Sequence, residues 1–310
     1  MFLFLSCQDE TEADKVVNST NLNIEIERFD KLFYKAKSIG EMHKLSQQYP
    51  FLFPIEIPLE LMVEKANDTL LNELNNEVQS VFSNTTILKE ELESLFKYTK
   101  YYFKSAKTPR VITLINEVDD ASRAIYNDSI ALISLDNYLG KEHRFYVDIP
   151  LYKTQFFESQ FIVGDLAENY ILQKTPFSNS NRFVEKMVYY GKMAYAKKLL
   201  LPNAKEAAIL DYQEEQYNWA MANEYYVWSY FVENELLFST DSKLDLRFLQ
   251  AAPFSKFYLE LDAESPGRIG CFIGYRIVDE YMKTHKLSLE ELLATSSKLI
   301  YEQSKYKPSK

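Results

Sequence analysis

Arg110-Val111-Ile112-Thr113-Leu114-Ile115 and Ser129-Ile130-Ala131-Leu132-Ile133-Ser134-Leu135 are two runs rich in β-branched residues, each bounded by polar residues typical of turns. Such runs predict strands. Upstream, the stretch 22–29 alternates apolar and polar residues, which predicts another strand with one buried face. Downstream, apolar residues recur with a helical period over roughly 155–173, 178–200, 204–238, 270–284 and 288–302. This order predicts an α+β fold that is mainly helical, with a small sheet in the first half.

Composition and charge exclude several classes of protein. The 310 residues include 7 Gly and 10 Pro, which disfavours disordered, collagenous and turn-dense all-β chains. The net charge of −10 repels phosphate backbones, so nucleic acid is not an expected partner. Cys7 and Cys271 lie near opposite ends of the chain, which excludes a disulfide framework and CxxC zinc sites. With His43, His143 and His285 far apart in sequence, metal and triad chemistry are strongly limited, and we expect no cofactor.

The N-terminal residues suggest a lipid anchor. Met1-Phe2-Leu3-Phe4-Leu5-Ser6-Cys7 is too short to cross a bilayer, but residues 1–7 resemble the remnant of a signal peptide ending in a lipobox, with Cys7 as the lipidated residue. No basic residue precedes the apolar run, so upstream residues could be missing. The alternative is a partly buried segment with a free thiol. We expect residues 8–20 to form an acidic tether and residues 21–310 to form a single globular domain.

The stretch Ile162-Val163-Gly164-Asp165-Leu166-Ala167-Glu168-Asn169-Tyr170 follows the predicted strands and is expected to be helical. The order of strands followed by two long helices resembles the zinc-metallopeptidase (zincin-like) core, in which an H-E-x-x-H helix supplies two zinc ligands. Gly164 and Glu168 would occupy the histidine positions, and neither provides an imidazole. A later helix places Tyr190 and Lys192 where an acidic ligand would be expected. The residues therefore predict a degenerate peptidase-like core without metal ligands.

Two alternatives to this interpretation remain open. The helix could be an ordinary amphipathic one, with Asp165 and Glu168 in solvent. The chain could instead be a working hydrolase with Asp165, Glu168 or Glu224 as general acid or base. Glu224 lies in an aromatic-rich segment, four residues before Trp228, where a core helix with solvated acids is the simpler interpretation.

A cluster of glycines is the sharpest local signal. Gly267, Gly270 and Gly274 are three of the 7 glycines and lie within ten residues of Pro266. Gly270 and Gly274 share one helical face, which predicts close packing against another backbone. On this interpretation Arg268 matters less to stability than Gly274. The alternative is an anion-binding site at the start of the helix, with Arg268 as the ligand.

Several stretches resemble the GldB gliding-motility lipoproteins of Bacteroidetes. They are Ile26-Glu27-Arg28-Phe29-Asp30, Tyr49-Pro50-Phe51, Leu135-Asp136-Asn137-Tyr138-Leu139-Gly140, Asn223-Glu224 with Trp228, Leu236-Leu237-Phe238, and the segment 262–282 around the glycine cluster. The resemblance implies a cell-envelope lipoprotein, membrane-anchored and facing the periplasm, that is needed for gliding and associated with the type IX secretion machinery. It also implies distant kinship to zinc-dependent proteases, but provides no catalytic residue. We therefore expect a protein that binds envelope partners, with an envelope hydrolase as the alternative.

Overall fold

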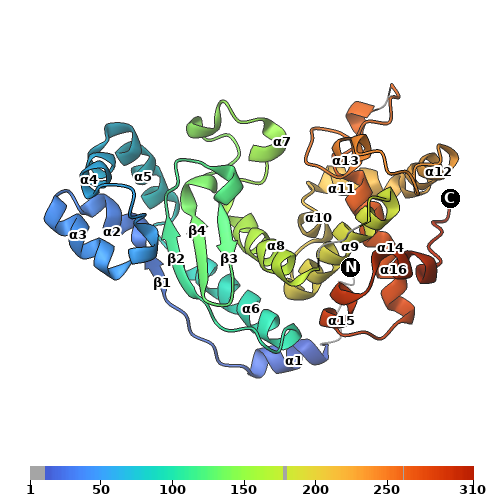
Figure 1. Ribbon diagram of the computed structural model, residues 1–310, viewed down its shortest axis with the longest axis horizontal. Coiled ribbons are helices and arrows are strands. Elements are labelled where there is room, and N and C mark those ends of the chain that lie inside the picture. Colours follow the sequence, from blue (N-terminus) through green and yellow to red (C-terminus); the bar gives the residue numbers. More distant parts are fainter. Residues whose placement is uncertain (1–10, 177–179, 261) are drawn as a thin grey trace, which may run out of the picture.

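A four-stranded mixed sheet lies in the first half of the chain (Figure 1). The computed structural model describes residues 11–176, 180–260 and 262–310. The strands are β1 (Ile26–Arg28), β2 (Arg110–Leu114), β3 (Ala124–Tyr126) and β4 (Ile130–Ser134), in the order β1-β2-β4-β3. β1, β2 and β4 are parallel, with Val111 opposite Ala131, and β3 pairs antiparallel to β4. The sheet predicted from the two β-branched runs is confirmed.

Helices cover both faces of the sheet. Ile112 and Leu132 face a smaller core formed by α2 (Phe29–Lys35), α3 (Ile39–Gln48) and α4 (Leu59–Asn67), which α5 (Thr69–Val81) adjoins. Val111, Ala131 and Ile133 point the other way, into the main core. There α6 (Thr86–Tyr102) and α8 (Ile162–Lys174) pack against each other, and α8 lies along β3. The alternation of side chains along each strand therefore divides the molecule into two cores.

The second half of the chain is helical and is built around α9 (Phe183–Leu200) and α14 (Ile269–Thr284), which pack closely together. The other helices of this half surround that pair (Figure 1). They are α10 (Glu206–Ile209), α11 (Glu214–Ala222), α12 (Glu224–Glu233), α13 (Lys243–Phe248), α15 (Leu289–Ala294) and α16 (Ser297–Ser304). The mainly helical α+β fold class expected from the sequence is confirmed.

Several predicted boundaries are wrong, because turns interrupt long apolar patterns. The stretch 22–29 is a strand only at β1, and Phe29 already begins α2. The helix expected at 155–173 begins at Ile162, after the short helix α7 (Leu151–Thr154) and a 3-10 turn. The segment 204–238 is divided into α10, α11 and α12, and 288–302 into α15 and α16. The helical spacing of apolar residues can continue across a short turn, so this spacing does not show where one helix ends and the next begins.

The predicted acidic tether is wrong for residues 12–19, which form the helix α1 (Glu12–Ser19). Thr11 caps this helix, and its side chain exchanges hydrogen bonds with Asp14 in a capping box. Ala13 and Val17 are buried in the main core, where α1 packs against α6. These two apolar residues, four positions apart, and a hydrogen bond from the Tyr98 hydroxyl to Asp14 hold the acidic helix on the globular domain. Residues 1–10, including the predicted lipidation site Cys7, lie outside the described residues.

Candidate functional site

The structure brings together two groups of residues that lie about a hundred positions apart in sequence. Asp165 and Glu168 project from α8, and Arg268 immediately precedes α14. Asp211, in the turn after α10, joins them. Its carboxylate forms an ion pair with Arg268, whose Nη2 also lies 4.0 Å from Oε1 of Glu168. The helix motif and the glycine-cluster arginine, treated separately in the sequence, are therefore parts of one site.

Lys197 from α9 occupies the centre of this site, with only 4 % of its side chain exposed. Its Nζ lies 2.7 Å from Oδ1 of Asp211 and 3.3 Å from Oε2 of Glu168. Burial alone would lower the pKa of Lys197, but the neighbouring carboxylates, Asp211 first, raise the pKa above its ordinary value. A Cβ on Gly164 would lie 3.4 Å from Cε of Lys197. A side chain larger than alanine at 164 would thus compete with the lysine for space.

A second ion pair closes the site on the side of the sheet. Arg123, just before β3, places Nη2 at 2.7 Å from Oδ1 of Asp165, and the hydroxyl of Tyr138 donates to Oδ2 of Asp165 at 2.8 Å. Burial raises the pKa of Asp165 to about 6, although Arg123 acts in the opposite direction. Neither Asp165 nor Glu168 is freely solvated, so the expectation of an ordinary amphipathic helix with both acids in solvent is wrong.

Three adjoining pockets, of about 20, 120 and 270 Å³, all include Asp211 and Arg268 in their walls. The pocket of about 120 Å³ has two walls. One is formed by residues 152–156, at α7 and just after it, and the other by the loop that contains Ala251 and Ala252. The charged cluster is therefore buried but borders a cleft.

The charges of the cluster balance. Its three carboxylates, Asp165, Glu168 and Asp211, each face at least one of three cations, Arg123, Lys197 and Arg268. Within residues 11–176, 180–260 and 262–310, no group of three or more histidine, cysteine or carboxylate side chains is placed to hold a metal ion. The geometry is that of a closed ion-pair network, with internal cations against every carboxylate.

The glycines beside Arg268 lie where helices and loops approach each other. α9 and α14 cross at Gly191 and Gly274: a Cβ on Gly191 would overlap the backbone of Gly274, and a Cβ on Gly274 would overlap the carbonyl oxygen of Met187. A Cβ on Gly270 would lie 2.9 Å from the Phe248 carbonyl oxygen. Gly267 similarly abuts Ala252. Close backbone approach accounts for all of these glycines.

A family profile described as "Gliding motility protein GldB" matches residues 10–308. The chain belongs to the GldB family. Membership implies a role in gliding motility, and the family is one of lipoproteins. Comparisons with curated proteins and with solved structures found no match. No helix in the described part of the chain is long and apolar enough to cross a membrane.

Two of the stretches that resemble GldB proteins contribute to the charged cluster. The segment 135–140 supplies Tyr138, which holds Asp165, and also buried Asp136, which accepts the backbone N–H groups of Asn116 and Val118. The segment 262–282 supplies Arg268. Arg123, Lys197 and Asp211 were not predicted from the sequence. The only local signal for Asp211 is the capping box formed by Gln213 and Gln216, which marks a helix start just after it.

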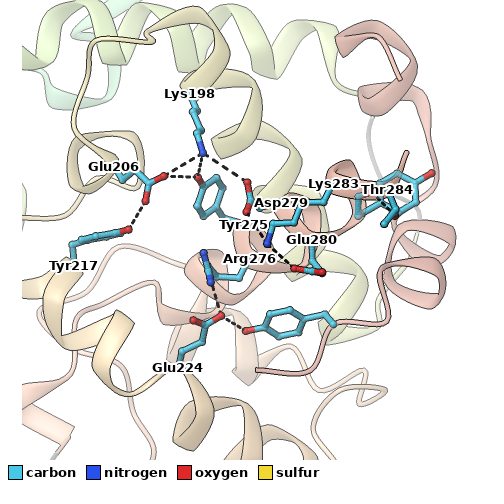
Figure 2. A network of polar contacts seen from close by, with 12 residues as sticks. Lys198, Glu206, Tyr217, Glu224, Tyr275, Arg276, Asp279, Glu280, Lys283 and Thr284 are labelled. Atoms are coloured by element: carbon cyan, nitrogen blue, oxygen red, sulfur yellow. Dashed lines mark hydrogen bonds and ion pairs between the residues drawn. The ribbon is translucent and has the colours of Figure 1, made fainter. Parts of the chain in front are cut away.

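Glu224, another GldB-like position, belongs to a different network (Figure 2). Its Oε1 accepts from Nε of Arg276 at 2.8 Å and from the Tyr306 hydroxyl at 2.6 Å. Lys198, also in Figure 2, bonds Glu206 at 3.2 Å and the Tyr275 hydroxyl at 2.9 Å. The three candidate acid–base residues are therefore not in one place, because only Asp165 and Glu168 border the cleft.

Tyr190 and Lys192 of α9, which stand where an acidic zinc ligand would be expected, have different surroundings. Lys192 is buried, and its Nζ donates to the carbonyl oxygens of Leu293 at 2.8 Å and Thr295 at 2.9 Å, at the end of α15. Burial lowers the pKa of Lys192 to about 8. Tyr190 lines the smallest of the three pockets. Lys192 thus acts as a cap for the carbonyls of α15.

Proposed function

We propose that this GldB-family protein is a lipid-anchored envelope protein that faces the periplasm and associates with the type IX secretion machinery. It supports gliding by binding other envelope proteins rather than by catalysis. The balance of charges in the cleft is the observation that supports a function without catalysis. A general base must turn an oxygen toward its substrate and a catalytic metal needs unpaired ligands, whereas each carboxylate here is held in place by an internal cation.

Lys197 is the residue that explains how the site can lack a metal. Its ammonium lies beside Gly164 and 3.3 Å from Glu168, the two positions compared above with zinc-binding histidines. We infer that a peptidase-like core has replaced a metal with an internal ammonium group, which neutralises carboxylates but leaves no open coordination position. Cys271 offers no alternative nucleophile, because burial raises the pKa of its thiol to about 11.

One observation favours the alternative, an envelope hydrolase. Asp165 borders the cleft, and its pKa of about 6 suits a general acid near neutral pH. However, Arg123 and Tyr138 engage its two oxygens at 2.7 and 2.8 Å, so a substrate would first have to displace one of them. This cost makes binding the better-supported function.

The test uses carboxamide variants in gliding cells that lack the native copy. Asp165→Asn, Glu168→Gln and Glu224→Gln each remove the acid–base group but keep the shape of the side chain. Glu142→Gln, at an exposed loop position, is the control. Each variant that folds should restore gliding and retain the envelope proteins cross-linked to the wild type in intact cells. A variant with normal thermal unfolding and normal cross-links but no gliding would show that the carboxyl group performs chemistry.

A further inference from the structure

A second pocket, of about 590 Å³, lies between α6, the start of α8 and the segment 201–214. Much of its wall is apolar, including Phe161, Val163, Leu201 and Pro202. It is separate from the charged cluster described above, and none of the six charged residues of that cluster lines it. Its volume is within the range of pockets that hold small molecules or the side chains of a partner protein.

Glu91, on α6, is the unexplained group in this pocket. It is half-buried, and among the described residues no hydrogen bond or ion pair reaches its carboxylate. Burial is the only influence on its pKa, which it raises. The cation among the lining residues, Lys205, is already paired with Glu214 at 3.0 Å. The pocket thus carries an uncompensated negative charge.

Tyr212 lies between this pocket and the charged cluster. It lines the same pocket with only 4 % of its surface exposed. Its hydroxyl is buried and has no hydrogen-bond partner within the described part of the chain. Buried hydroxyls normally have partners, because an unpaired one costs free energy. Tyr212 also lines the 120 Å³ pocket beside Asp211 and Arg268, so its hydroxyl belongs to the side of the charged cluster, and Glu91 is the group without a partner in the present pocket.

A half-buried carboxylate without a partner lowers the stability of the fold, since burial disfavours its charged form. A glutamine at 91 would avoid this cost. Function is a common reason for keeping a group that the fold itself does not need. Because Glu91 shares this pocket with an apolar wall that includes Phe161, Val163 and Leu201, the partner that fits is a cation with an apolar body.

We propose that this pocket binds a lysine or arginine side chain of a partner polypeptide, with the aliphatic stem on the apolar wall and the charged head on Glu91. Long basic side chains bury their stems in this way while their charge is paired. The net charge of −10 also attracts a cationic partner. The inference rests on the proposed binding function and names the chemistry by which one partner is recognised.

The test is a binding titration of the purified full-length protein with three probes. Two are acetylated, amidated tripeptides, Leu-Lys-Leu and Leu-norleucine-Leu, and the third is spermidine. The lysine peptide should bind at least about tenfold more tightly than the norleucine peptide. Glu91→Gln should abolish this difference. Glu142→Gln, which changes an exposed carboxylate outside this pocket, should change the affinity for the lysine peptide less than about threefold.

Thermal unfolding distinguishes a binding role for Glu91 from a structural one. Glu91→Gln should leave the Tm unchanged or raise it by a few degrees, about 1–3 °C. A lower Tm would show that the carboxylate has a structural partner and would overturn the inference. Equal affinity for the lysine and norleucine peptides would overturn it too, and spermidine binding as tightly as the lysine peptide would point to a free polyamine instead. These experiments use purified protein, whereas the proposed function is tested by gliding of cells. Failure of one can therefore be told apart from failure of the other.

Discussion

Arg268 and Asp211 form an ion pair in which both residues have left-handed backbone conformations, with φ of 60° and 53°. For residues other than glycine this conformation costs roughly 1–2 kcal/mol each. Arg268 reaches the pair as the residue before α14, and Asp211 as part of the turn that ends α10. Strained residues persist where the surroundings fix them, and they cluster at functional sites. The strain is here offset by an interaction between the two strained residues themselves.

We expect Arg268→Ala to destabilise the protein by about 3–5 kcal/mol, because it leaves Asp211 with a buried charge and one cation fewer. Lys205→Ala is the control: it removes the exposed pair with Glu214 and should cost less than about 1 kcal/mol. Chemical denaturation of the three proteins measures both values. The expectation from the sequence that Arg268 matters less to stability than Gly274 did not include its pair with Asp211. Equal losses in Arg268→Ala and Lys205→Ala would show that this pair adds little.

The crossing of α9 and α14 gives a second prediction. Gly274→Ala should cost at least about 2 kcal/mol, because even a methyl group would overlap the backbone at Met187 and force the helices apart. Gly40→Ala is a matched control within helix α3, where nothing lies within 4 Å of an added Cβ. That change should be neutral or stabilise by up to about 1 kcal/mol. If both variants unfold at the same denaturant concentration, the close approach is not essential.

The helical pattern and the glycine cluster were visible in the sequence because each is local. Gly164, Asp165 and Glu168 lie within two turns of one helix, and the glycines near Arg268 are conspicuous in a glycine-poor chain. The groups that complete the site come from other elements. Lys197 is 29 residues from Glu168, and Asp211 is 57 residues from Arg268. Nothing in the local sequence indicates such ion pairs, since surface lysines and aspartates have the same surroundings in sequence.

Asp211 also shows why the long helix predicted at 204–238 was wrong. The apolar pattern continues through Leu210 and Tyr212, both of which are buried. The helix nevertheless ends at Ile209, and Asp211 adopts a left-handed conformation in the turn before α11. Aspartate tolerates the left-handed conformation better than most residues, but an aspartate in the sequence does not predict that conformation. The turn is stabilised by the long-range pairs with Lys197 and Arg268, which become visible only in the folded structure.

Asp165 should make stability depend on pH in a defined window. Burial raises its pKa from 3.8 to about 6, so the folded state binds this proton more tightly than the unfolded state. Its contribution to stability is present below pH 4 and is lost as the pH rises to about 6. Relative to Asp165→Asn, the wild type should thus lose about 2–3 kcal/mol of unfolding free energy between pH 4 and pH 7. A difference between the two proteins that does not change with pH would contradict this assignment.

Chelation should have no effect on the fold. The carboxylates of the cluster are neutralised by Arg123, Lys197 and Arg268, and removing a metal leaves these pairs intact. We expect the same Tm with and without excess EDTA, and less than about 0.1 equivalent of zinc after purification without added metal. One equivalent of tightly bound zinc in the wild type would contradict the internal-cation interpretation.

Cys7 provides the last prediction, on how the domain is held at the membrane. The globular part begins with α1, so the chain from Cys7 to Glu12 can span at most about 18 Å. An acylated Cys7 would therefore hold α1 close to the bilayer surface. Cys7→Ser should release the protein from the membrane fraction, because acyl chains supply the membrane affinity, and it should leave the Tm unchanged. Cys271→Ser, at the buried thiol of α14, should remain in the membrane fraction. Recovery of Cys7→Ser with membranes at the wild-type level would show that the domain is held there by another means.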